Sequence, residues 1–236
     1  MSKAKVARKS TRIDMTAMSD VTVLLLTFFM LTSTFVKKEP VQVNTPGSVS
    51  EVKIPETNIL SILIDTEGKV FMSFDKQEDM IKTLIAVSKE FPEAYQYNVE
   101  IDTETGKLTG DPEDVKLLTK FKILPTFGAD IRQMKEFLAM KSEDQDRVLP
   151  TLGIPTDSVS GVKYANGSVK TQFELWVEKA NAGKSTDDKL RIAIKADQKT
   201  SYAVIKTVMN SLQTLKENRY NLITSLKQAN DDKQSH

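Results

Sequence analysis

The sequence contains no cysteine, and its single histidine, His236, is the last of 236 residues. The absence of cysteine excludes disulfide bonds, thiolate zinc sites and cysteine nucleophiles. A lone terminal histidine also argues against a histidine-based triad or metal cluster. No pair of carboxylates has the helical spacing and context that suggest hydrolysis. We therefore expect no enzyme, no metal site and no cofactor.

The sequence also lacks a surplus of charge of one sign. It has 33 basic and 32 acidic residues. A nucleic-acid-binding protein needs a basic surplus to neutralise phosphates. We therefore expect no nucleic acid among the partners.

What the chain does have is one long apolar run, residues 15–36, with Asp20 as its only charged residue. As a helix, these 22 residues would extend about 33 Å, enough to cross a bilayer core and contact its lipids. Residues 1–14 carry five basic residues and one acidic residue, whereas residues 37–57 carry three of each. The positive-inside rule then predicts a cytoplasmic N-terminus, with the bulk of the chain across the membrane. A cleaved signal peptide and a buried soluble helix are the alternatives, but the run is longer than a signal-peptide core and has no small-residue cleavage pattern.

Asp20 is the candidate functional residue of this run. A carboxylate in a membrane helix is costly, and desolvation disfavours its charged form, so such a group can bind and release protons. At 100° per residue, Thr16, Thr27 and Thr34 lie within about 40° of Asp20 and form one polar stripe with it. The threonines could instead only bond back to their own helix. A lone acid on a lone helix would face lipid tails, which implies a partner with several spans.

The run beginning at Arg12 resembles the membrane signature of the ExbD/TolR family, approximately D-x-T-P-x-(I/V)-D-V-x-x-x-L-L-x-x-F-x-(M/V). Eight residues fit that signature: Asp14, Thr16, Asp20, Val21, Leu24, Leu25, Phe28 and Met30. Ala17 replaces the usual proline, and Ser19 the usual branched residue. Two weaker matches follow in the right order: residues 41–46 resemble the segment after the family's membrane helix, and residues 191–212 resemble its last strand and helix.

The resemblance implies a proton-channel subunit of a bacterial inner-membrane motor, with Asp20 as the proton-translocating residue. The partners implied are an ExbB-like polytopic pentamer, a TonB-like energy transducer and a second copy of this chain. The residues of the segment after the helix are partner-binding candidates: Val41, Val43, Asn44 and Pro46. A TolR-like role in a Tol-Pal-type envelope system stays open. So do a flagellar-type stator subunit and, from another class, a signal-anchored periplasmic binding or scaffold protein in which Asp20 is incidental.

The rest of the chain predicts a small periplasmic α/β (α+β) domain over residues 58–228. Residues 37–57 contain three prolines and predict an extended linker before it. Runs of branched and aromatic residues at 59–64 and 70–74, separated by Asp65–Lys69, predict a hairpin. Helical spacing follows from Met80 to Ser88. Near the C-terminus we expect a strand over 190–196, a helix over about 202–215 capped by Thr200 or Ser201, a strand over 220–226, and a tail over 229–236.

Residues 92–186 stand between these two halves and predict a mainly helical insertion. Asp111-Pro112 predicts the start of one helix. Asp130 predicts another, with Ile131, Met134, Phe137 and Leu138 on one face. A third helix should carry Phe173, Trp176, Val177 and Ala180. The insertion is interpreted as a packing elaboration or as a surface that docks a partner.

Overall fold

The computed structural model describes residues 15–32, 41, 43, 45, 47–48, 57–102, 107–164, 167–185, 188–217, 219–223 and 225–226. The chain divides into two units, Met1–Lys38 and Glu39–His236. Each unit is described by itself below.

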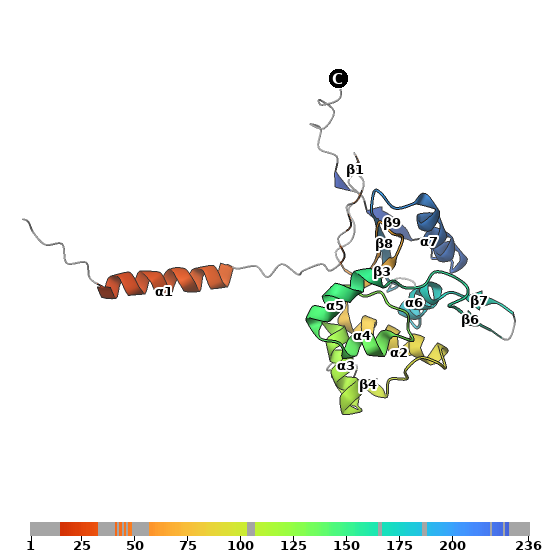
Figure 1. Cartoon of the computed structure of the whole chain (residues 1–236), viewed down its shortest axis with the longest axis horizontal. Coiled ribbons are helices and arrows are strands. Elements are labelled where there is room, and N and C mark those ends of the chain that lie inside the picture. The colour runs from red at the N-terminus through yellow and green to blue at the C-terminus, as the bar shows by residue number, and fades with distance from the viewer. Residues whose placement is uncertain are drawn as a thin grey trace, which may run out of the picture. The chain divides into compact units, whose positions relative to one another are not determined.

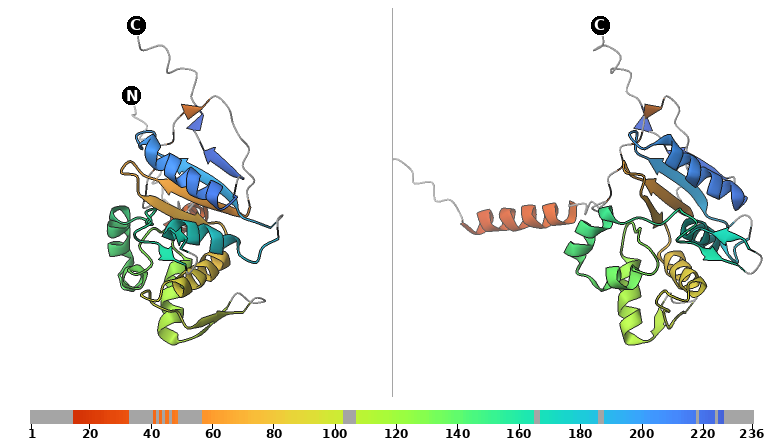
Figure 2. Two further views of the ribbon diagram at one scale, coloured as in Figure 1. Left: turned by 90° about the vertical axis from the view of Figure 1, so that its right-hand side faces the viewer. Right: turned by 45° about the vertical axis from the view of Figure 1, so that its right-hand side comes forward.

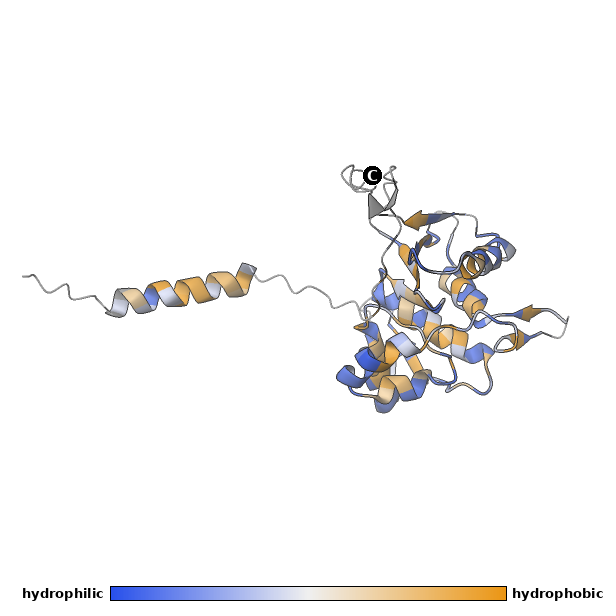
Figure 3. Cartoon of the chain, turned by 45° about the horizontal axis from the view of Figure 1, so that its top comes forward, coloured by the Kyte–Doolittle hydropathy of each residue, from blue (hydrophilic) through white to orange (hydrophobic). Residues whose placement is uncertain are grey.

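The first unit contains helix α1, Met15–Thr32 (Figure 1). Its 18 residues include neither glycine nor proline, and leucine and methionine, which favour helices, recur along it. Its large apolar side chains that the structure describes are exposed, and Figure 3 shows hydrophobic colouring along most of the helix. The helix is therefore apolar almost all round, with Asp20 as its only charged residue.

The second unit is built on a four-stranded sheet with the order β3-β2-β8-β9. The predicted hairpin is confirmed, because β2 (Ile59–Ile64) and β3 (Val70–Phe74) pair antiparallel. In its turn, the Asp65 carboxylate accepts hydrogen bonds from the backbone N–H groups of Glu67 and Lys69, at 2.9 and 2.8 Å. Gly68 has a φ of +82°, which glycine adopts without strain.

Two crossover connections in this sheet each join a pair of parallel strands. Strand β8 (Arg191–Ala196) pairs parallel with β2, and β9 (Tyr220–Ile223) pairs parallel with β8. Such crossovers are almost always right-handed, so two that step in the same direction place their helices on one face of the sheet. That face carries Leu60, Ile62 and Ile64, which are fully buried.

The helices of this layer are α2 (Gln77–Glu90), α6 (Gln172–Asn181) and α7 (Tyr202–Thr214). Helix α6 contacts both α2 and α7, and it lies between them in both views of Figure 2. The predicted helices over 80–88 and 202–215 are confirmed. Ser201 is the N-cap residue of α7 without a side-chain cap bond, while the Thr200 hydroxyl donates instead to the carbonyl oxygen of Asp65 at 2.6 Å.

The predicted insertion contains helices and two hairpins. The helical elements before α6 are α3 (Pro112–Lys122), α4 (Met134–Ala139), α5 (Ser142–Val148) and the 3-10 turn Leu149–Thr151. The hairpins pair β4 (Val99–Ile101) with β5 (Leu108–Gly110), and β6 (Val162–Lys163) with β7 (Val169–Lys170).

All three helices predicted in the insertion are present, but of the two predicted helix starts the one at Asp111 is confirmed and the one at Asp130 is wrong. Asp111 caps α3 by accepting a hydrogen bond from the N–H of Glu113 at 2.9 Å. The third predicted helix is α6, which begins with a capping box between Thr171 and Glu174. Asp130 does not open α4. Its carboxylate accepts the N–H of Arg132 in a preceding turn, and α4 begins at Met134.

The insertion shares the domain's hydrophobic core. The backbone of Phe127 forms an antiparallel β-bridge with Met72 of β3. The centroid of its ring lies 4.9 Å from that of Phe121 and 4.8 Å from that of Trp176. Next to it, Gly128 approaches β3 so closely that a Cβ atom would lie 2.4 Å from the Phe71 ring. Residues 92–186 therefore complete the domain and supply part of its helical layer.

The segment predicted as a linker contributes a strand of its own. Strand β1 (Gly47–Ser48) pairs parallel with β10 (Ser225–Leu226). The strand predicted over 220–226 is thus two strands, β9 in the main sheet and β10 against β1. The predicted tail, residues 229–236, lies outside the described residues.

Candidate functional site

Helix α1 carries the acid singled out from the sequence. Asp20 lies in its second turn, and it is exposed in the isolated chain, as are the other α1 side chains that the structure describes. The apolar side chains around it are exposed by 50% (Leu25) to 87% (Leu31) of their surface. Large apolar side chains exposed on every side of a helix mark a surface that meets another apolar medium or partner.

The threonines of α1 bond to their own helix. The hydroxyl of Thr27 donates to the carbonyl oxygen of Leu24 at 2.9 Å. Those of Thr22 and Thr32 donate in the same way to Met18 and Phe28, both at 2.8 Å. This is the back-bonding expected as the alternative to a functional stripe. Helical geometry still places Thr16, Asp20 and Thr27 within about 40° of one another on α1. Thr34 lies outside the described residues.

In the part of the chain that the structure describes, no helix is both long and apolar enough to cross a membrane.

The partner-binding candidates after α1 fall partly within the domain. Val41 is only 5% exposed and belongs to the domain's hydrophobic core, and Val43 packs against that core. Asn44 and Pro46 lie outside the described residues. The apolar contacts of Val41 and Val43 are therefore made with the domain itself, and β1 attaches the same segment to β10.

A pocket of about 650 Å³ lies among α6, strand β7 and the end of α7. Four of its six charged side chains form ion pairs: Lys170 contacts Glu178 at 2.6 Å, and Lys189 contacts Glu217 at 2.7 Å. The arrangement neutralises its own charges and offers no nucleophile with an adjacent base. Within the described ranges, no cluster of three or more Asp, Glu, His or Cys side chains could hold a metal ion.

No local pattern in the sequence indicates a buried acid in the insertion. Asp114 is 2% exposed, and its carboxylate accepts the Tyr95 hydroxyl and the N–H of Asn98, both at 2.8 Å. The hydrogen bond to Asp114 raises the pKa of Tyr95 to about 12, and burial raises the pKa of Tyr97. These bonds fasten residues 95–98 to α3. Asp114 lies on the buried face of α3, together with Leu117, Leu118 and Phe121. Its burial alone distinguishes it from the exposed acids of the chain, and burial cannot be recognised from the sequence.

One ion pair joins α2, which precedes the predicted insertion, to α6, which lies within it. Lys179 donates a hydrogen bond to the carboxylate of Glu90, and this bond, more than any other contact, lowers the pKa of Glu90. Both side chains are about one-quarter exposed. The pair is a local contribution to packing between two helices of the same layer.

Comparison with known families gives a match over residues 7–107, to the model described as biopolymer transport protein ExbD/TolR. The matched range includes α1, the hairpin β2–β3, α2 and β4. It does not include residues 191–212, whose resemblance to the family's last strand and helix stays a prediction. No curated protein and no solved structure gives a significant match.

Proposed function

We propose that this chain, whose residues 7–107 match the family model described as biopolymer transport protein ExbD/TolR, is the proton-channel subunit of an ExbB–ExbD-like motor. In this role the proton gradient across the bacterial inner membrane energises TonB-dependent transport at the outer membrane. The observation that carries the proposal is Asp20, the only charged residue in the 18 residues of α1. In this role the chain transfers protons and transmits mechanical work, and it catalyses no chemical step on a substrate.

In the proposed topology, residues 15–36 cross the membrane once, with the N-terminus in the cytoplasm and the domain in the periplasm. A helix of 22 residues would measure about 33 Å, enough to cross a hydrocarbon core of about 30 Å. The excess of positive charge in residues 1–14 supports this orientation. The exposed apolar side chains of α1 supply the surface that lipid and partner helices would cover.

The proposed mechanism assigns one step to the Asp20 carboxylate. An oxygen of this group takes up a proton from one side of the membrane and releases it to the other, passing between a charged and a neutral state. The charged state is costly in a membrane, by about 2.5–3.5 kcal/mol at mid-helix, so each state favours a different surrounding. One charge crossing 100 mV releases about 2.3 kcal/mol, and several protons supply a mechanical step.

The need to shield Asp20 from lipid also indicates which partners the chain would have. Asp20 and the hydroxyl groups on its face need shielding from lipid, which a ring of polytopic ExbB-like subunits, a pentamer in the proposed complex, would supply. We propose that two copies of this chain sit in the ring and that a TonB-like protein receives the work.

Replacement of Asp20 tests the proposal in cells. Asp20→Asn keeps the size and polarity of the side chain and removes the exchangeable proton, so TonB-dependent uptake should be lost at normal expression. Asp20→Glu keeps a carboxyl group and should retain part of the uptake. Full uptake in Asp20→Asn cells, with uptake still dependent on the gradient, would overturn the proposal. If Tol-dependent envelope integrity failed instead, the motor would serve the Tol-Pal-type system.

A further inference from the structure

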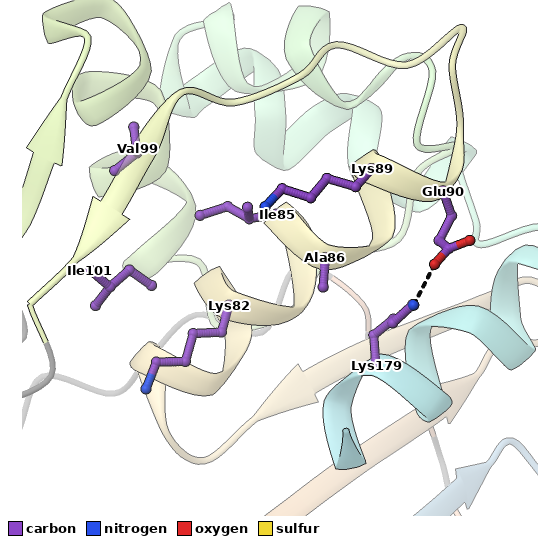
Figure 4. A pocket seen from close by; sticks show the side chains of 8 residues that line it. All are labelled: Lys82, Ile85, Ala86, Lys89, Glu90, Val99, Ile101 and Lys179. Carbon is purple, nitrogen blue, oxygen red and sulfur yellow. Dashed lines mark hydrogen bonds and ion pairs between the residues drawn. The ribbon is translucent and has the colours of Figure 1, made fainter. Parts of the chain in front are cut away.

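A groove lies between helix α2 and strand β4 of the domain. Its volume is about 420 Å³, and Ile85 and Ala86 of α2 line it together with Val99 and Ile101 of β4 (Figure 4). These four apolar side chains are only half-buried. Val99 and Ile101 share one face of β4, because side chains alternate along a strand, and Glu100 points to the other.

Two lysines give this groove a positive charge. Lys82 and Lys89 line it from α2, and both are exposed. Seven residues separate them, which is about 10.5 Å along the helix. Neither has an acidic partner within 4.0 Å among the described residues, whereas the third lysine, Lys179, is neutralised by Glu90. The groove therefore has an apolar floor and two uncompensated cations at its rim.

The backbone of β4 presents a free edge at the same residues. Hydrogen bonds join Asp102 to Lys107 and Asp111 to Asn98 across the hairpin. Bonded pairs alternate along an antiparallel ladder, so Glu100 and Thr109 form the bonded pair between these two. The N–H and C=O groups of Val99 and Ile101 consequently point away from β5, and in the described part of the chain they have no strand partner.

From these three observations we infer that the groove binds an extended acidic segment of a partner protein. The segment adds a strand to the free edge of β4, which is the usual way in which extended peptides bind an open sheet edge. Its apolar side chains cover Ile85, Val99 and Ile101, and its carboxylates contact Lys82 and Lys89. Binding at this groove requires neither Asp20 nor proton transfer, so it goes beyond the proposed function and can be tested independently of it.

Two synthetic peptides test the inference with the full chain in detergent. One has four Glu-Val repeats and the other has four Lys-Val repeats. The acidic peptide should bind at least about tenfold more tightly, because the cations of the groove attract one peptide and repel the other. It should also slow hydrogen exchange at the amides of Val99 and Ile101, and its affinity should fall as salt is added.

Charge reversal gives the matched control. The double variant Lys82→Glu/Lys89→Glu should invert the preference between the two peptides. Lys206→Glu reverses one exposed lysine on the outer side of α7 and should leave the preference unchanged. Equal binding of both peptides, or an unchanged preference in the double variant, would overturn the inference. Tighter binding after deletion of residues 227–236 would also overturn it, because the groove would then hold the chain's own C-terminal tail, which contains Asp231 and Asp232.

Discussion

Helix α1 and the domain formed within residues 57–226 treat their apolar side chains in opposite ways. The domain buries them around Trp176, Phe127 and Leu60, all fully buried. Helix α1 exposes them by half or more, up to 87% at Leu31. Burial of apolar area is the main favourable term in folding, at about 25 cal/mol per Å². The domain therefore obtains this term from its own chain, whereas α1 must obtain it from lipid or from another protein.

The surroundings of acidic side chains also differ between the two regions. Asp114 in the domain is buried, and two hydrogen bonds from the domain itself satisfy its carboxylate. Asp20 on α1 lies on a surface that an external medium must cover, so partners would provide its surroundings. This contrast separates residues whose replacement should damage folding from a residue whose replacement should damage function alone.

The largest effect on folding should come from the centre of the core. Trp176→Ala removes a fully buried ring that packs 4.8 Å from Phe127, which should lower the free energy of unfolding by about 3–5 kcal/mol. Chemical denaturation followed by circular dichroism measures this change. Because Trp176 lies in α6, its replacement should not change the helical content of α1.

The control for this variant is Trp176→Phe. The indole N–H of Trp176 has no acceptor among the described residues, so its removal leaves no hydrogen bond broken. A loss of stability in Trp176→Phe as large as in Trp176→Ala would contradict the assignment of the ring to core packing.

A smaller effect should come from the cap of α3. Asp111→Ala removes the carboxylate that accepts the N–H of Glu113, at a cost of about 1 kcal/mol. Asp111→Asn keeps an acceptor at the same place and should retain most of the stability. If both variants proved equally destabilised in thermal denaturation, charge and not capping would be the cause.

The smallest effect, and the one that depends on pH, concerns Glu90 and Lys179. Contact with Lys179 lowers the pKa of Glu90 below its unfolded value, so the pair stabilises the fold above that value. The contribution is lost as the pH falls through the lowered folded pKa. Glu90→Gln should cost about 0.2–1 kcal/mol at pH 7, and the difference from the parent chain should vanish once acid has protonated Glu90 in the folded chain. A difference that does not shrink with falling pH would assign the effect to packing between α2 and α6.

Local signals in the sequence predicted much of the domain. The hairpin β2–β3 follows from two branched runs around a turn, and α3 follows from Asp111 and the proline after it. Helix α7 was expected from its apolar spacing. The start of α4 was wrong because Asp130 looks like a cap but serves a separate turn before the helix.

Contacts between distant residues could not be predicted in this way. The bridge from Phe127 to Met72, the pairing of β1 with β10 and the place of α6 between α2 and α7 all join segments far apart in the chain. The cations of the groove illustrate the same limit. Lys82 and Lys89 look like an ordinary solvated helix face until β4 is placed beside them.

The central claim is that the Asp20 carboxylate carries protons, and proton flux through the assembled complex tests it most directly. The complex, purified from membranes through a tag on this chain, would be reconstituted into liposomes and supplied with a membrane potential. Proton flux should fall to that of empty liposomes in Asp20→Asn and should persist in Asp20→Glu, with the melting of the domain unchanged in both. Undiminished flux in Asp20→Asn would contradict the account.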